Sequence, residues 1–344
     1  MAAKIFAMTP PSTAPKWWWW GFVVVLAAVL LTMPSYTNIG LQLDLSIIFI
    51  MSILALSMSF LWGFGGMLSF GQTAFFGIGG YTYAVLSLNT GETTGSIFAA
   101  IALPMAFAAL LGYFLIYGRI SAIFFSIITL VVTLILEKGM RSTSNEEYVI
   151  GSVQLRGQNG ISTVPALQVP WNPQVELFVD GVFYLSAVLL ILVYVGLRLL
   201  LTTRFGRILV CIRENERRTE LLGYDSRVYN LIAFVIAGGI AGLAGALYSV
   251  WGNFIAPEVM NLGSAANVVI WVIVGGKSTL IGPIVGTAGI QYLTNWLGGQ
   301  GVGQITLILG VILMAFVTIF HEGMLPTIGL AISYLKDRLM PKRA

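Results

Sequence analysis

The sequence predicts an all-α membrane protein that crosses the bilayer about ten times. Of its 344 residues, 57% are hydrophobic and only 9% are Asp, Glu, Lys or Arg, whereas about a quarter of an ordinary soluble domain is charged. This composition excludes a soluble enzyme, a disordered chain and a nucleic-acid-binding protein as descriptions of the whole chain. A helix needs about 20 residues to cross a bilayer, so ten crossings would use about 200 residues.

Ten apolar runs form one transmembrane domain, 17–334, between an N-terminal tail, 1–16, and a basic C-terminal tail, 335–344. In chain order, the runs lie near residues 17–34, 44–62, 72–88, 97–117, 120–137, 178–200, 229–250, 264–276, 281–298 and 304–321. The tryptophans at 17–20 are typical of an interfacial belt. We prefer an uncleaved anchor to a signal peptide there, because no small-residue cleavage site follows. The run at 264–276 is short, so we expect it to be tilted, broken or continued through the following glycines.

The basic residues predict that both termini face the cytoplasm. An even number of spans places both termini on the same side of the membrane. If that side is the cytoplasm, 15 of the 18 Lys and Arg residues lie on inner segments, and three, Lys138, Arg141 and Arg156, lie outside. This asymmetry follows the positive-inside rule, so the predicted topology is N-in and C-in.

Two connections between the spans are longer than turns. The outer one, 138–177, is rich in glycine and proline, and we expect a loop with little helix. The inner one, 201–228, contains the charged stretch Arg213–Leu222, which has no Gly or Pro and consists of good helix formers. We expect a short amphipathic helix on the cytoplasmic surface that ends at Gly223, although composition alone fits a charged, solvated loop equally well.

The 39 glycines cluster in ways that predict close packing and one broken helix. Seven of them lie in 63–80, together with polar side chains that would be costly against lipid. We therefore expect a broken or re-entrant element there. The pairs Gly238/Gly242 and Gly282/Gly286 have the four-residue spacing that lets transmembrane helices approach closely, and we expect tight packing at the seventh span.

Polar side chains near this element supply the candidates for a substrate pathway. The polar residues that we consider are Ser57, Ser59, Ser69, Gln72, Thr73, Ser126, Thr129, Thr133 and Asn267. The expected pathway residues among them are Ser69, Gln72, Thr73, Thr129 and Thr133.

Catalytic, metal and nucleotide sites find little support in the sequence. The stretch 275–279, Gly-Gly-Lys-Ser-Thr, resembles the end of a phosphate-binding loop, but Trp271 stands where that motif needs its first glycine. The chain has one cysteine, Cys211, and one histidine, so neither a disulfide nor a His-rich metal centre is expected. We interpret the adjacent pair Glu137 and Lys138 as an interfacial anchor. We expect no enzyme activity, no cofactor and no metal.

Four blocks of the sequence resemble the LivM-type inner-membrane permeases of ABC importers for branched-chain amino acids and amides. The first is the glycine-rich segment 61–81, LWGFGGMLSFGQTAFFGIGGY. The cytoplasmic segment 204–225 resembles the loop by which these permeases dock on their ATPase, and 241–248 and 274–283 also match the family pattern. Together the blocks cover most of residues 45–320.

The resemblance implies a multi-pass bacterial inner-membrane protein that pairs with a second homologous permease to form the translocation pathway. Two cytoplasmic ABC ATPases would drive transport by alternating access, and a periplasmic binding protein would deliver the substrate. The helix near 213–223 would be the coupling helix that seats in a groove of the ATPase. The residues implied in this coupling are Arg213, Glu214, Asn215, Glu216 and Gly223.

The substrate and the class of transporter each have an alternative. The stretches 269–281 and 222–225 lean towards the urea-transporting branch of the family, but we place branched-chain or other neutral amino acids ahead of urea and short amides. An ATP-independent secondary carrier or channel would need its own coupling-ion or filter residues, and an intramembrane enzyme would need clustered His, Asp or Glu. The sparse charged residues at membrane depth supply neither.

Overall fold

The computed structural model describes residues 38–145, 147–169 and 172–299, together with residues 308, 310, 311 and 314. The predicted first span, its tryptophans at 17–20 and both tails lie outside these residues, as does nearly all of the predicted last span at 304–321. The other eight predicted spans fall within the described residues.

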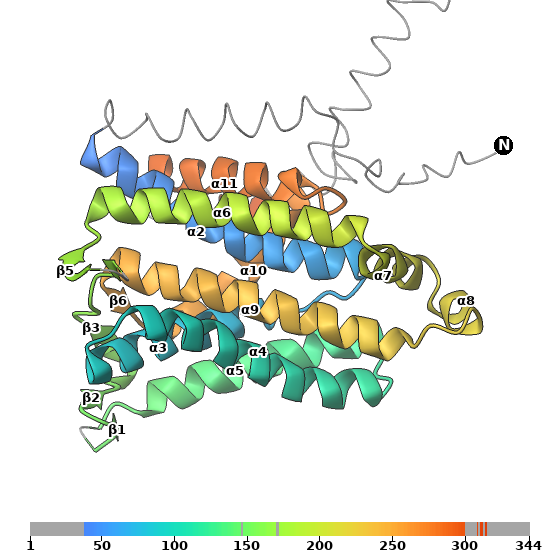
Figure 1. Ribbon diagram of the computed structural model, residues 1–344, viewed down its shortest axis with the longest axis horizontal. Helices are drawn as coiled ribbons and strands as arrows, with labels where there is room; N and C mark the ends of the chain where they lie inside the picture. Colours follow the sequence, from blue (N-terminus) through green and yellow to red (C-terminus); the bar gives the residue numbers. More distant parts are fainter. Residues whose placement is uncertain are drawn as a thin grey trace, which may run out of the picture.

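All eight of these predicted spans are helical, with boundaries a few residues from those expected. The helices are α2 (Ile39–Ser59), α3 (Gln72–Thr90), α4 (Thr94–Tyr117), α5 (Ala122–Ser142), α6 (Val179–Thr202), α9 (Ser226–Gly252), α10 (Leu262–Gly275) and α11 (Ile281–Gly299), and α2 continues into a π-helical turn, η2 (Phe60–Phe64). They run side by side along the long axis of the molecule (Figure 1).

Five helices in the described part of the chain are long and apolar enough to cross a bilayer: α2 with η2, α4, α5, α6 and α9. The short span expected at 264–276 is the 14-residue helix α10. It ends where Gly276 adopts φ +104°, a conformation that residues with a side chain rarely take. The total of ten crossings and the N-in/C-in topology stay predictions.

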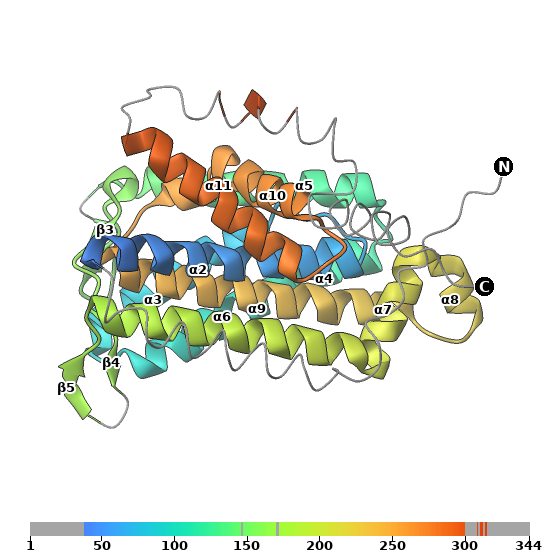
Figure 2. The ribbon, with the colours of Figure 1, turned by 90° about the horizontal axis from the view of Figure 1, so that it is seen from above.

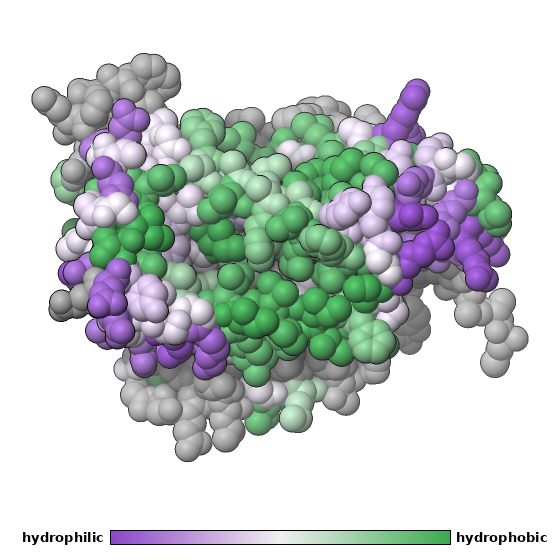
Figure 3. Space-filling model, turned by 90° about the horizontal axis from the view of Figure 1, so that it is seen from below, coloured by the Kyte–Doolittle hydropathy of each residue, from purple (hydrophilic) through white to green (hydrophobic). Residues whose placement is uncertain are grey.

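The flank formed by α4 and α5 shows how the molecule suits a bilayer. Both helices bury only a narrow stripe, and large apolar side chains such as Phe114 and Ile123 are exposed. Figure 3 shows the resulting apolar band between two polar ends. Apolar surface costs about 25 cal/mol per Å² when water covers it, whereas lipid tails are as apolar as these side chains. The flank is therefore suited to lipid or to an apolar partner.

The two ends of the bundle differ in structure and charge. One end carries two short helices, α7 (Arg204–Glu214) and α8 (Glu216–Leu221). The other carries the 3₁₀ turns η3 (Gly157–Asn159) and η4 (Pro257–Met260) and three antiparallel strand pairs, β1 (Val149–Ile150) with β2 (Val153–Gln154), β3 (Ile161–Ser162) with β6 (Phe254–Ile255), and β4 (Gln168–Val169) with β5 (Asn172–Glu176). We call these the α8 end and the strand end.

The connection expected at 138–177 contains little helix between α5 and α6, as predicted, and it also carries short strands that the sequence analysis did not predict. They are two to five residues long, so they are too short to show the alternating pattern by which a strand is read from sequence. One of them, β3, pairs with β6 from a distant connection, which local sequence does not reveal. Among the described residues, Lys138, Arg141 and Arg156 lie at the strand end and the other basic residues at the α8 end, as the predicted topology requires.

The helix predicted at 213–222 is interrupted at Asn215, and this prediction was wrong in that respect. Asn215 ends α7 and precedes α8, with an extended backbone at φ −161° and ψ 97°. Its side chain accepts a hydrogen bond from the amide of Arg218 at 2.9 Å. Asparagine is among the preferred residues at this N-cap position, so the cap starts a new helix. The helical region ends before Gly223, where φ is +90°.

Glycines on α9 allow three helices to meet closely. A Cβ atom on Gly242 would lie 2.6 Å from the carbonyl oxygen of Ala100 on α4, and one on Gly238 would lie 2.8 Å from Cβ of Ala108. On the other side, Gly79 of α3 lies directly against Gly242. Close approach of this kind is what small residues permit in membrane helices. The predicted tight packing at the seventh span is confirmed.

A second glycine contact joins α10 and α11, which pack over α2 (Figure 2). A Cβ atom on Gly282 or on Gly286 would lie 2.7 Å from backbone atoms of Gly275. The close approach predicted for Gly282/Gly286 is therefore also confirmed.

Candidate functional site

The helix break predicted within 63–80 is confirmed, but it is shorter than expected. η2 ends at Phe64, residues 65–71 are not helical, and α3 begins at Gln72. Gly66 adopts a left-handed conformation with φ +76°. π-helical turns are frequent at functional sites, and non-helical backbone at membrane depth is tolerated only inside protein or beside water. We call residues 65–71 the broken segment.

Side-chain hydroxyls of α5 form hydrogen bonds with backbone groups of the broken segment, because this segment has no helical hydrogen-bond pattern of its own. The Thr129 hydroxyl accepts from the amide of Phe70 at 3.2 Å. The Thr133 hydroxyl donates to the carbonyl of Phe70 at 3.3 Å, and the Ser126 hydroxyl donates to the carbonyl of Leu68 at 2.7 Å. Each unsatisfied backbone group would cost several kcal/mol in a membrane interior. Hydroxyls on one face of α5 therefore hold the broken segment in place.

The remaining predicted pathway residues lie at the start of α3 and beside it. The Ser69 hydroxyl accepts from the amide of Gly71 at 3.1 Å, and the side-chain oxygen of Gln72 accepts from Ser57 at 3.1 Å. The Gln72 side-chain nitrogen is buried without a hydrogen-bond partner among the described residues. The structure thus gathers Ser69, Gln72, Thr73, Thr129 and Thr133, each at most 2% exposed, around the break. They form a closed polar core rather than the lining of an open channel.

Two cavities lie on either side of this polar core along α5. One, of about 590 Å³, opens at the α8 end and is lined by charged side chains of the α4–α5 turn, α7, α8 and α9. The other, of about 380 Å³, lies at the strand end between α3, α4 and α5 and is almost wholly apolar. We call them the charged cleft and the apolar cavity. α5 contributes Phe125 to the first and Met140 to the second, and Thr129 and Thr133 lie between these positions.

Arg213 points into the protein, and its side chain is only 15% exposed. Its Nη1 donates a hydrogen bond to the carbonyl of Gly63 in η2. Gly66 packs against the same side chain, because a Cβ atom there would lie 2.9 Å from Cγ of Arg213. Lys277 contacts η2 as well, with Nζ 4.9 Å from the centre of the Trp62 ring, a cation–π geometry. The lysine of the rejected phosphate-loop match therefore packs against the helix that precedes the break.

The exposed part of the α8 end includes two residues that the sequence analysis missed. Glu214, Asn215 and Glu216 are exposed, as a docking surface requires. Beside them, Leu221 and Leu222 are 85% and 76% exposed. An amphipathic-helix interpretation assigns such leucines to a buried face. The signal that could have found them is their position after a run of charged residues, at the end of a helix that is too short to bury them.

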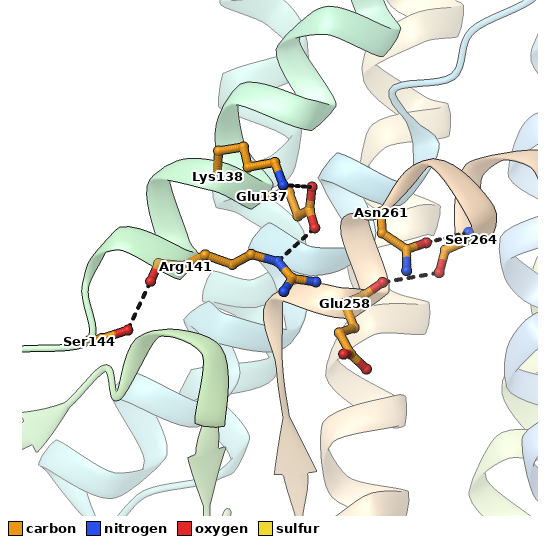
Figure 4. Close-up of polar contacts among 7 residues, drawn as sticks. All are labelled: Glu137, Lys138, Arg141, Ser144, Glu258, Asn261 and Ser264. Carbon is orange, nitrogen blue, oxygen red and sulfur yellow. Dashed lines mark hydrogen bonds and ion pairs between the residues drawn. The ribbon is translucent and has the colours of Figure 1, made fainter.

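Glu137 is buried and has a closer partner, Arg141, than the Lys138 with which it was expected to form an interfacial anchor. Its residue is 4% exposed, and its carboxylate accepts from Nε of Arg141 at 2.7 Å. The Lys138 side chain is 75% exposed and its Nζ lies 4.0 Å away. Residues four apart on a helix face each other whereas adjacent ones do not, so the spacing of Glu137 and Arg141 was the available signal. Figure 4 shows Arg141 reaching from α5 towards η4, where Glu258 projects.

Membrane-length helices, a polar break inside the bundle and a cavity on either side of it define a multi-pass membrane transport protein. The comparison with protein families makes this specific. Residues 41–320 match the family described as "Branched-chain amino acid transport system / permease component", and the chain belongs to this family. Its place is the inner membrane of a bacterium, which it crosses several times.

Known relatives include two permeases of the LivM type. LivM of Escherichia coli, a high-affinity branched-chain amino acid transport system permease protein, is 28% identical over 253 residues, which are 66% of this chain and 56% of the relative. A probable branched-chain amino acid transport permease protein of Methanocaldococcus jannaschii is 26% identical over 64% of this chain and 65% of the relative.

A third relative has a different name. The ribose import permease protein RbsC of Escherichia coli is 26% identical over 61% of this chain and 62% of the relative. In each of the three comparisons the chain spans less than two thirds of the relative's length. No solved structure matches the chain.

Proposed function

We propose that this chain is one permease subunit of an ABC importer that carries branched-chain and other neutral amino acids into the cell. The names of the two LivM-type relatives support the amino acid as substrate, whereas the ribose permease among the relatives makes sugar the competing choice. An almost wholly apolar cavity at the strand end favours a substrate with an aliphatic side chain over a sugar or urea.

The observation that carries the ATP-driven mechanism is the exposed apolar pair Leu221 and Leu222 at the α8 end. Burying one leucine gains about 1.5–3 kcal/mol relative to leaving it in water. The pair lies next to exposed charge and beyond the apolar band, so a protein is a better match than lipid. Two cytoplasmic ABC ATPases are the proposed partners, with Glu214, Asn215 and Glu216 as polar contacts around the leucines.

Arg213 connects this docking surface to the broken segment. The residue lies in the last turn of α7, and its guanidinium holds the carbonyl of Gly63 in η2. A displacement of α7 and α8 by the ATPase would therefore act directly on the helix that precedes the break. Gly223 adopts φ +90° after α8, so its proposed role is to turn the chain rather than to contact the ATPase.

The two cavities suit alternating access. With the α8 end in the cytoplasm, the charged cleft faces inward and the apolar cavity faces outward. The proposed gate between them consists of five buried polar residues, Ser69, Gln72, Thr73, Thr129 and Thr133. If the α5 hydroxyls exchanged their hydrogen bonds to the broken segment for bonds to water or substrate, the two cavities would join. A second homologous permease would cover part of the exposed apolar surface, and a periplasmic binding protein would dock at the strand end.

The test is uptake into proteoliposomes that hold the co-expressed complex, with its binding protein supplied outside. Labelled leucine, urea and ribose are compared with and without ATP. We expect ATP-dependent uptake of leucine. Uptake of urea or ribose instead would keep the importer and change its substrate, and uptake that needs neither ATP nor partners would show a carrier or channel.

A further inference from the structure

The apolar cavity at the strand end has the size of a small-molecule site. Its lining comes from α3, α4, α5, β1, η4 and the connection after β2. The side chains used below are Ile78, Tyr81, Leu136, Met140, Leu155 and Met260. Leu136 lies one helical turn beyond Thr133, so the cavity ends next to the proposed gate.

One residue that lines this apolar space, Tyr81, carries a polar atom without a partner in the described part of the chain. Tyr81 is only 7% exposed, and its hydroxyl is buried without a hydrogen-bond partner among the described residues. Arg141 is close enough to act electrostatically on that hydroxyl. A buried polar group without a partner is uncommon in native proteins and requires an explanation. A bound ligand with an acceptor atom would supply one.

Two side chains of opposite charge lie close to residues that line the cavity: Arg141 follows Met140 on α5, and Glu258 precedes Met260 by two positions on η4. Arg141 uses Nε for the ion pair with Glu137, but a guanidinium has five N–H donors, and within the described residues its terminal nitrogens donate no hydrogen bond. Across from it, Glu258 is exposed and forms no ion pair with another described residue. Figure 4 shows the Arg141 guanidinium turned towards Glu258 and η4.

η4 is itself fixed in position. The Ser264 hydroxyl donates to the carbonyl of Glu258 at 3.1 Å, and the Asn261 side chain accepts from the amide of Ser264. Met260, between these residues, lines the cavity. The backbone at Glu258 is therefore held in a short turn that is hydrogen-bonded to the start of α10, two residues before the cavity residue Met260.

We propose that this cavity binds a zwitterionic amino acid with an aliphatic side chain before it crosses the gate. The side chain fills the apolar space between Leu136, Met140 and Met260. The α-carboxylate accepts hydrogen bonds from Arg141 and from the Tyr81 hydroxyl, and the ammonium group lies against Glu258. Charge-assisted bonds of this kind are the strong ones. The inference rests on the proposed function, because it gives the neutral amino acid substrate a place in the permease.

The test compares uptake of leucine and of alanine per ATP hydrolysed, in proteoliposomes that hold the assembled complex and saturating binding protein. Arg141→Gln should lower the uptake of both about tenfold, the effect of losing a hydrogen bond to a charged group, and Arg141→Lys should restore part of it. Met140→Trp should fill the cavity and lower leucine uptake about tenfold more than alanine uptake. Lys138→Gln, exposed on the same helix, is the matched control and should change neither.

Each outcome decides a different point. Normal leucine uptake and an unchanged leucine-to-alanine ratio in the variants would overturn this site and leave the proposed function standing. Wild-type uptake of urea or ribose with no amino acid would overturn both. If Met140→Trp only displaces a co-purifying lipid, the cavity is an acyl-chain site and the proposal is wrong. If the complex with Arg141→Gln fails to assemble because the charge on Glu137 is left unpaired, a double variant takes its place. Glu137→Gln/Arg141→Gln removes both charges, and its uptake of leucine and alanine per ATP hydrolysed decides.

Discussion

α9 and α5 hold two consecutive parts of the chain, α3 and the broken segment before it, in different ways. α9 holds α3 by shape, because Gly79 and Gly242 let the two backbones touch. α5 holds the broken segment by hydroxyl bonds from Ser126, Thr129 and Thr133. Two thirds of the apolar stretch of α9 is buried (67%), against 28% for α5. Interlocked backbones cannot separate without leaving a void, whereas hydroxyl bonds can be exchanged for water. The comparison indicates that α9 is the fixed support and α5 the movable element.

The largest expected effect comes from breaking the α9 contact. Gly245→Leu would drive a side chain into the backbone of α3 at Phe76 and Gly80, so we expect a loss of about 3 kcal/mol or more in the free energy of unfolding, measured by denaturation in detergent. Gly252→Leu is the control, because a Cβ atom on Gly252, at the end of the same helix, would have no neighbour within 4 Å among the described residues. Equal stability of the two variants would contradict the fixed role of α9.

The next effect concerns the docking surface rather than the bundle. Leu221→Ser/Leu222→Ser should leave thermal stability unchanged, since both side chains are exposed. It should reduce co-purification of the ATPase and ATP-dependent uptake at least about tenfold, because each buried leucine is worth about 1.5–3 kcal/mol. Leu192→Ser, an exposed leucine in the apolar band on α6, should keep the ATPase. Normal co-purification with the double variant would remove the docking role of these leucines.

A smaller effect is expected at the proposed gate on α5. Thr133→Val keeps the shape of the side chain and removes its bond to Phe70, worth about 1 kcal/mol. We expect ATP hydrolysis to continue while uptake per ATP falls a few-fold, measured on the same proteoliposomes. Thr294→Val on α11 is the matched change, because its hydroxyl bonds only its own helix, at Ile290. Equal uptake per ATP hydrolysed in Thr133→Val and Thr294→Val would show that the Thr133 bond has no role in the proposed gate.

The smallest effect is expected where α8 begins. Asn215→Ala removes the N-cap bond to Arg218, worth about 1 kcal/mol to the helix. Hydrogen exchange should become faster at the amides of α8 with little change elsewhere, whereas Arg217→Ala, an exposed neighbour without a capping bond, should leave exchange unchanged. Unaltered exchange in Asn215→Ala would show that the cap does not hold α8.

Features that depend on local sequence pattern could be predicted, whereas contacts between residues far apart in the chain could not. Apolar runs, the spacing of Gly238/Gly242 and the polar break depend on local pattern, and these predictions agree with the structure. The inward turn of Arg213 depends on Gly63, which is 150 positions away in the chain, and no local pattern encodes that contact. The interruption at Asn215 could have been predicted, because an asparagine just before a charged helical turn is a capping signal.

The candidate site divides in the same way. The five predicted pathway residues do come together, because one face of α5 and the start of α3 carry them. Their closed state and the cavities on either side depend on how α3, α4 and α5 pack, which hydrophobic patterning does not specify. Glu137 illustrates the limit, because its sequence neighbour Lys138 suggested a surface pair while the helix geometry pairs it with Arg141.

The most direct test of the account is whether α5 moves relative to α3 while α9 does not. Spin labels on a Cys211→Ser background would report two distances at the strand end of the assembled complex, Thr90 to Lys138 and Thr90 to Gly252, which all lie at exposed positions. With a non-hydrolysable ATP analogue we expect the α3–α5 distance to change and the α3–α9 distance to stay constant. Equal changes in both distances, or a change confined to α9, would contradict the assignment of α9 as support and α5 as gate.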